Sequence, residues 1–201
     1  MGRLIDGKWV PGDVNTSSSK GEYKRVPRTF LNKINKKSIF LPEKNRYHLY
    51  VSYACPWAHR TLIMRNLKEL DEIISFSVVS PEMMDEGWKF DNSIKESTVD
   101  HLYNFRNLFQ VYQKADKKIS TTVTVPILWD KKNETIVNNE SSEIIRIFNY
   151  SFNDLTHNHD DYYPEKYRDS IDEINHFIYH YINNGVYKVG FSKTQSAYDK
   201  A

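Results

Sequence analysis

The chain has 201 residues, 39% of them hydrophobic and 27% charged, so it can build one large domain or two small ones and is not a disordered chain. Its single cysteine, Cys55, excludes an internal disulfide framework and a multi-cysteine zinc site, and favours a reducing compartment. No apolar run approaches the roughly 20 residues that span a bilayer, and residues 1–10 lack the apolar stretch of a signal peptide. We therefore expect a cytoplasmic protein with no metal and no membrane partner.

Basic residues are concentrated near the start of the chain. Residues 1–44 hold 10 basic and 4 acidic residues, a net charge of +6, whereas residues 45–201 hold 18 and 22, a net charge of −4. A basic arm is one way to bind nucleic acid or an anionic surface. The basic residues form no continuous run and no nucleic-acid motif follows them. We expect instead a solvated or surface-draped extension without regular periodicity, and no nucleic-acid partner.

The first regular elements after this extension follow a strand, helix, strand pattern. Residues 46–52 alternate in polarity and are rich in β-forming residues, and residues 74–79 form a second such run. Pro56 stands where a helix between them would begin. The apolar face expected of this helix is Leu62, Ile63, Leu67 and Leu70. A βαβ unit of this size predicts two parallel strands with a right-handed crossover.

The chain between residues 81 and 118 is a polar segment of a length that is often functional. The elements expected within and after it are a helix at 100–114, strands at 123–129 and 135–137, and a helix from Glu140 to about Phe152. Asn139 is the expected N-cap of the last helix.

A polar break at 153–163 is the best candidate for a domain boundary. Apolar residues then recur every three or four positions, as in an amphipathic helix: Tyr167, Ile171, Ile174, Ile178 and Tyr181. Asn183, Asn184 and Gly185 are a typical end for such a helix.

Cys55 lies at the turn between the first strand and the helix that begins at Pro56. The first turn of a helix and its dipole favour an anion, so we expect a thiol whose pKa lies below its free value of ~8.5. Arg60 is close in sequence and would add positive charge. An unreactive buried cysteine is the alternative, which the turn position disfavours. Position 58 is Ala58 rather than a second cysteine, so resolving a mixed disulfide needs an external thiol, for which glutathione is the abundant candidate.

Two further motifs are suited to a small peptide ligand. Val125 precedes Pro126 inside a good strand, where a proline leaves a ladder position unpaired. In a thioredoxin-like fold this would be a cis bond near the thiolate, with the Val125 backbone available to an extended ligand; an edge-strand proline is the alternative. Glu140 and Ser141 stand at a helix start, where they could bind the ammonium and carboxylate groups of the γ-glutamyl end of glutathione. Ordinary N-capping is the alternative for that pair.

Four residues in the polar break raise the question of a metal site: His157, His159, Asp160 and Asp161. No further His or Cys stands at a matching spacing, so we expect a solvated loop there and no metal.

The three motifs at Cys55, at Val125-Pro126 and at Glu140-Ser141, taken together and in this order, resemble those of one known family. It is the omega-like Xi class of glutathione transferases, the glutathionyl-hydroquinone reductases, and the resemblance covers about residues 40–201. The segments that carry it are residues 46–63 (RYHLYVSYACPWAHRTLI), 87–90 (GWKF), 123–146 (VTVPILWDKKNETIVNNESSEIIR) and 183–191 (NNGVYKVGF).

The resemblance implies an α/β thioredoxin-like domain followed by the start of an all-α glutathione-transferase C-terminal domain. The corresponding division is a basic extension at 1–44, a glutathione-binding domain at 45–152 and an incomplete helical domain at 160–201. Family positions for glutathione fall on Trp88, Val125, Glu140 and Ser141, and Tyr187 matches a tyrosine on the aromatic-substrate side. The implied chemistry is the glutathione-dependent reduction of S-glutathionyl-hydroquinones, with Cys55 attacking the sulfur and a second glutathione resolving the mixed disulfide. Glutathione and glutathionylated aromatic molecules are the expected partners, and a homodimer is left open.

Two departures from the family pattern qualify this expectation. Thr121 and Thr122 stand where the family commonly has Gly-Arg, which would lower the affinity for anionic glutathione. Family members are also longer, so the chain resembles a truncated member that lacks later helices. The alternatives are an omega-like thioltransferase or dehydroascorbate reductase, which needs only Cys55 and the glutathione half-site, and a non-catalytic remnant that binds a partner.

Overall fold

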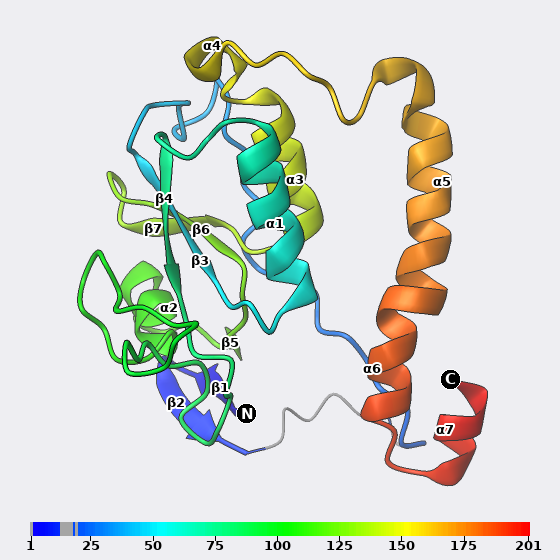
Figure 1. Cartoon of the computed structure of the whole chain (residues 1–201). Helices are drawn as coiled ribbons and strands as arrows, with labels where there is room; N and C mark the ends of the chain where they lie inside the picture. Colours follow the sequence, from blue (N-terminus) through cyan, green and yellow to red (C-terminus); the bar gives the residue numbers. More distant parts are fainter. Residues whose placement is uncertain (1, 13–17, 19) are drawn as a thin grey trace. The chain divides into compact units, whose positions relative to one another are not determined.

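The chain folds into two compact units. A computed structural model describes residues 2–12, 18 and 20–201 (Figure 1). The first unit comprises residues 2–12 and 28–161 of this described part, and the second comprises residues 18, 20–27 and 162–201.

A four-stranded mixed sheet forms the centre of the first unit. Its strands are β3 (Tyr47–Val51), β4 (Ile74–Val78), β6 (Ile127–Asp130) and β7 (Thr135–Asn138), in the order β4-β3-β6-β7. β3 and β4 are parallel, as the βαβ pattern predicts, and the β3–β6 and β6–β7 pairs are antiparallel. Every residue of β3 is buried, because it is an inner strand of the sheet. This strand leads directly into the turn that carries Cys55.

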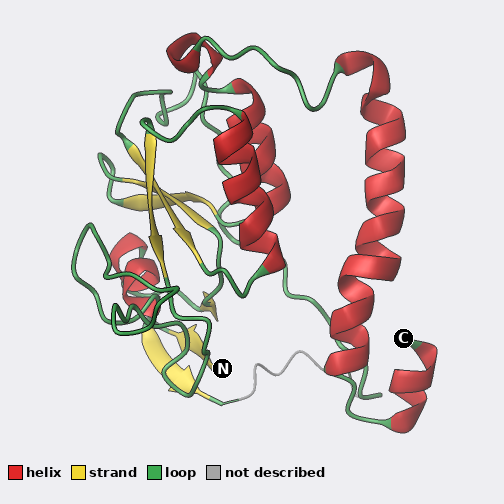
Figure 2. Ribbon diagram, viewed as in Figure 1, coloured by secondary structure: helices red, strands yellow, loops and turns green. Residues whose placement is uncertain are grey.

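Helices cover both sides of this sheet. α1 (Pro56–Leu67) and α3 (Ser141–Tyr150) lie side by side on one side, and α2 (Phe109–Ala115) lies on the other (Figure 2). The short α4 (Asn153–Thr156) follows α3. The arrangement confirms the thioredoxin-like fold expected from the sequence.

The expected apolar face of α1 is partly wrong. Ile63 and Leu67 are 46% and 44% exposed, whereas the buried residues of α1 are Ala58, Thr61 and Arg65. A charged side chain can be buried here because Arg65 Nε donates to the Ile74 carbonyl at 2.7 Å and Nη2 donates to the Asp71 carbonyl at 2.8 Å. These hydrogen bonds compensate for lost hydration, which apolar periodicity along the helix cannot reveal.

The N-terminal segment contains regular structure that the sequence did not suggest. β1 (Gly2–Ile5) and β2 (Lys8–Pro11) form an antiparallel hairpin, and β1 also pairs with the two-residue β5 (Thr121–Thr122). Leu4 is 1% exposed and belongs to the main hydrophobic core. Strands of four residues show too little alternation to be recognised without their partners.

Three element boundaries differ from those expected. The helix expected at 100–114 spans only Phe109–Ala115 (α2), and the strand expected at 123–129 begins only after Pro126, at the first residue of β6. The N-cap of α3 is Glu140 rather than Asn139, and its side chain accepts a hydrogen bond from the Ser142 amide. Asn139 is instead buried, with its side chain accepting from the Phe30 amide and donating to the Tyr112 hydroxyl. Its hydrogen-bonding capacity is therefore used in the core.

The second unit is built on one long helical run. It consists of η1 (Glu165–Tyr167), α5 (Arg168–Ile178), the π-helical turn η2 (Tyr179–Asn183), α6 (Asn184–Gly190) and the separate α7 (Gln195–Lys200). The amphipathic helix is confirmed, but its expected end is wrong: Asn183 and Asn184 both have helical backbone angles, so the chain continues into α6. In the described part of the chain, no helix is both long and apolar enough to cross a membrane.

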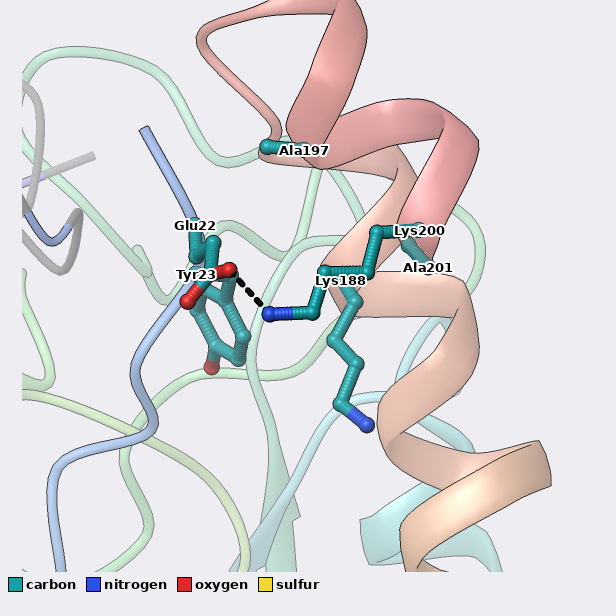
Figure 3. Close-up of a pocket in the computed structure, with 6 residues that line it drawn as sticks. All are labelled: Glu22, Tyr23, Lys188, Ala197, Lys200 and Ala201. Atoms are coloured by element: carbon teal, nitrogen blue, oxygen red, sulfur yellow. Dashed lines mark hydrogen bonds and ion pairs between the residues drawn. The ribbon is translucent and has the colours of Figure 1, made fainter. Parts of the chain in front are cut away.

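Residues 20–27 pack on this helical run. Arg25 Nε donates to the Asn184 side chain at 2.7 Å, and the Tyr23 ring stacks on Tyr187 and Phe191 with centroid distances of 5.9 and 5.5 Å. Figure 3 shows a shallow pocket beside them, where Lys200 forms an ion pair with Glu22. Part of the basic segment is thus an integral piece of the second unit.

Candidate active site

Cys55 stands at the N-cap of α1, as the sequence predicts. The Cys55 amide donates to the Ser52 carbonyl at 3.1 Å, which closes the turn after β3. Its own carbonyl accepts from the amides of Ala58 and His59, so the helix starts at the cysteine. The side chain is partly exposed and accepts no capping hydrogen bond from the first turn. The dipole of α1 would favour a thiolate at this position.

Val125 faces the sulfur of Cys55. The peptide bond between Val125 and Pro126 is cis, and the Cys55 sulfur lies 3.8 Å from the Val125 carbonyl oxygen. Val125 precedes the first residue of β6, so it stands outside that strand's ladder. The sequence-based expectation of a cis bond close to the thiol is confirmed.

Arg60 connects the helix of Cys55 with the start of α3. Its Nε and Nη2 atoms donate to the Ser141 hydroxyl at 3.0 and 2.7 Å, and Nη2 lies 3.7 Å from Glu140 Oε1. The guanidinium also lies over the ring of Trp57, 5.0 Å from its centroid. Cys55 and Arg60 on one helix are thereby joined to Glu140 and Ser141 on the next. From the sequence, Arg60 is expected only to add positive charge near Cys55, because a contact across 81 residues leaves no signal in local spacing.

Trp88 lies in the core of the first unit. It is 8% exposed, and its carbonyl accepts from the Leu108 amide at 2.9 Å. The preceding Gly87 has a φ of +71°, and a Cβ added there would lie 2.8 Å from the Trp9 ring. The Trp9 indole N–H donates to the Asp85 carbonyl at 3.0 Å, so the N-terminal hairpin supports the loop that carries Trp88. Trp9 is not among the site residues predicted from the sequence. The contacts described above do not connect Trp88 with Cys55, and its role toward glutathione stays a prediction.

Tyr187 belongs to the second unit. It lies on α6, stacks on Tyr23 and has the Arg25 guanidinium 4.4 Å from its ring centroid. Its assignment to the aromatic-substrate side stays a prediction.

The loop at 157–161 has a structural explanation. Lys68, which is 1% exposed, donates through Nζ to the carbonyls of Asn158 and Asp160 at 3.0 and 2.5 Å. Burial lowers the pKa of this lysine below its ordinary value. The Asp161 carboxylate accepts from the Asn149 side chain at 2.8 Å. Within the described residues, no group of three or more His, Cys, Asp or Glu side chains is arranged to hold a metal ion.

Comparisons with known proteins agree with this architecture. Residues 54–149 match the family model of the glutathione S-transferase N-terminal domain. Glutathionyl-hydroquinone reductase YqjG of Escherichia coli is 51% identical over all of this chain and 64% of its own length. The glutathione-bound structure of YqjG matches with a TM-score of 0.86 at 49% identity, covering 99% of this chain and 61% of that one.

Two other relatives extend the comparison to fungi. Glutathione S-transferase omega-like 2 of Schizosaccharomyces pombe is 50% identical over 92% of this chain and 60% of its own length. The glutathione S-transferase Xi of Phanerochaete chrysosporium matches with a TM-score of 0.89 at 48% identity, covering 92% of this chain and 60% of that one. The chain thus spans about three fifths of the length of these relatives. In sequence and in fold, the chain is thus most like glutathione transferases of the Xi class among the relatives compared above.

Proposed function

We propose that this chain takes part in the glutathione-dependent reduction of S-glutathionyl-hydroquinones, with Cys55 as the nucleophile. The observation that carries the proposal is the placement of Cys55 at the start of α1, beside the Val125 carbonyl. Arg60 on the same helix bonds to Ser141, which extends the site to the start of α3. The relative named glutathionyl-hydroquinone reductase YqjG, which is 51% identical over the whole chain, supports the choice of substrate.

In the first step, the Cys55 thiolate attacks the sulfur of the bound conjugate. A disulfide forms between Cys55 and the glutathionyl group, the sulfur–carbon bond breaks, and the ring carbon takes the electron pair and a proton as hydroquinone leaves. In the second step, another glutathione thiolate attacks the glutathionyl sulfur of the mixed disulfide. Glutathione disulfide leaves and the Cys55 thiolate returns, so glutathione is the reductant.

Each group of the proposed glutathione half-site would contact a different part of the ligand. The Val125 backbone would pair with the extended peptide, in the manner of an added strand. Glu140 would accept from the ammonium of the γ-glutamyl group, and Ser141 would donate to its carboxylate. Trp88 and Tyr187 are proposed for the glutathione and hydroquinone sides respectively, on the resemblance alone.

An omega-like thioltransferase or dehydroascorbate reductase is the second candidate. The relative named glutathione S-transferase omega-like 2, at 50% identity, favours it. This activity needs only Cys55 and the glutathione half-site. The rate with small glutathione mixed disulfides, relative to the rate with glutathionyl-hydroquinones, separates the two candidates.

Incubation with a glutathionyl-hydroquinone tests the proposal. We expect intact-mass measurements to show one added glutathionyl group on Cys55, hydroquinone to be released in equal amount, and free glutathione to remove the adduct. The Cys55→Ser variant should show neither adduct nor release. An unmodified Cys55 in a folded wild-type chain would refute the proposal.

A further inference from the structure

Arg60 makes a two-pronged contact with one hydroxyl group. Both Nε and Nη2 donate to Ser141 Oγ, at 3.0 and 2.7 Å. A serine hydroxyl has two lone pairs and one proton, so two donors occupy its accepting capacity. The Ser141 hydroxyl is then left to act as a donor.

Among the residues that the structure describes, the proton of Ser141 has one weak acceptor. The nearest acceptor described is Glu140 Oε1 at 3.5 Å, which is at the limit of a hydrogen bond. Glu140 Oε1 also accepts from the Ser142 amide at 3.2 Å and from its hydroxyl at 3.1 Å. Ser141 is therefore oriented to donate to an incoming oxygen, such as that of a carboxylate.

The side chains around this contact are also exposed enough for a ligand to reach them. The side chains of Arg60 and Glu140 are 33% and 29% exposed, although Ser141 itself is 3% exposed. Arg60 lies about one and a half turns along α1 from Cys55, and its guanidinium lies 5.0 Å from the centroid of the Trp57 ring. The arrangement links the helix that presents the sulfur to the helix start that would receive the ligand.

We propose that Arg60 is a positioning residue that makes the site selective for thiols and disulfides with a γ-glutamyl α-amino acid group. It fixes Ser141 as a donor and sets the distance between that donor and the sulfur of Cys55. The inference rests on the proposed function, because it deepens the role of the same half-site. Arg60 acts through Ser141 and Glu140, so the intrinsic reactivity of the cysteine should not depend on it.

Two disulfides, one with and one without a γ-glutamyl group, test whether Arg60 acts on ligand recognition and not on the reactivity of Cys55. In both reactions the Cys55 thiolate attacks a disulfide sulfur, a Cys55 mixed disulfide forms, and one thiolate leaves. Glutathione disulfide carries the γ-glutamyl group, whereas 2-hydroxyethyl disulfide does not. We expect Arg60→Met to slow mixed-disulfide formation with glutathione disulfide by about 10- to 100-fold, the effect of one charge-assisted hydrogen bond on affinity. The rate with 2-hydroxyethyl disulfide should be unchanged, which also shows that the variant is folded.

Three further variants make the test specific. Arg60→Lys keeps the charge but lacks the planar fork, so it should lose most of the preference for glutathione disulfide. Arg3→Met removes an exposed arginine from the first unit and should change neither rate. Ser141→Ala should reproduce the loss, and combining it with Arg60→Met should cause little further loss, because both remove the same donor.

The outcomes that overturn the inference differ from one another. Equal slowing with both disulfides would show that Arg60 acts on the reactivity of Cys55 instead. An unaltered preference in Arg60→Met would show that the Ser141 contact is only structural. A wild-type chain that reacts with both disulfides at the same rate would refute glutathione recognition itself, and the inference with it.

Discussion

Arg46 and Asp130 form a buried bidentate ion pair between the start of β3 and the end of β6. Arg46 Nε and Nη2 donate to the two carboxylate oxygens of Asp130, at 2.9 and 2.6 Å. Neither residue is more than 5% exposed. Arg46 also donates to Glu43 Oε1 at 3.0 Å and to the Ile39 carbonyl at 2.8 Å, so its donors are well used. The pair fixes the register of the strand that leads to Cys55.

Asp130→Ala should therefore be strongly destabilising. Removing one partner leaves a buried guanidinium without its counter-charge, which typically costs about 3–5 kcal/mol. The free energy of unfolding from urea titration measures the loss, and the exposed Glu96→Ala is the matched control. A loss below about 1 kcal/mol for Asp130→Ala would mean that water or Glu43 replaces the carboxylate.

Stability should fall on mild acidification because of His48. The ring is fully buried on β3, with Nδ1 2.8 Å from the Ser75 hydroxyl and Nε2 2.9 Å from the Ser77 hydroxyl. Burial, with smaller contributions from Lys131 and His101, lowers the pKa of His48 from 6.5 to about 3. Between these two pKa values His48 is protonated in the unfolded chain but neutral in the folded chain. The free energy of unfolding is therefore unaffected by His48 above about pH 6.5 and decreases as the pH falls toward 3.

The size of this effect follows from linkage. The loss from His48 approaches about 1.4 kcal/mol per pH unit below pH 6, in addition to the effects of other groups. In His48→Gln, which can still hydrogen-bond but does not titrate, the slope of unfolding free energy against pH should be smaller by about one proton. Identical slopes in the two proteins between pH 4 and 6 would contradict a neutral buried His48.

The main elements around Cys55 could be predicted from sequence because their signals are local. Alternating residues mark β3, Pro56 marks the start of α1, and Val125 before Pro126 marks the cis bond. Each signal spans a few neighbouring residues and depends on backbone geometry rather than on distant partners.

The remaining features depend on contacts between distant residues. β1 joins the sheet through β2 and through β5, and β5 lies more than 110 residues away in the sequence. Arg65 is buried and Ile63 is exposed because the guanidinium finds backbone carbonyls near β4. The contact of Arg60 with Ser141 joins two helices, so neither helix alone predicts it.

Gly87 and Trp9 should show energetic coupling in a double-mutant cycle. Gly87→Ala places a Cβ 2.8 Å from the Trp9 ring and also forces a φ of +71° on an alanine. The left-handed backbone conformation alone costs about 1–2 kcal/mol of stability. Trp9→Ala removes the stack on Phe109, at 5.0 Å between centroids, and the hydrogen bond to Asp85. In the double variant the steric cost disappears but the backbone strain remains. Unfolding free energies should therefore be non-additive, and simple additivity would rule out the close contact.

Substitutions at Glu140 should separate its capping role from its proposed ligand role. Glu140 Oε1 accepts from the Ser142 amide at 3.2 Å, so Glu140→Ala removes the N-cap of α3 and should cost about 0.5–2 kcal/mol of stability. Glu140→Ser restores a good capping side chain without a carboxylate. Calorimetric titration should show glutathione binding weakened by about 10- to 100-fold in both variants, because each lacks the acceptor for the ammonium group. Thermal unfolding should show a loss only in Glu140→Ala. If Glu140→Ser binds glutathione as tightly as the parent chain, the carboxylate serves α3 alone and the ammonium group must be bound elsewhere.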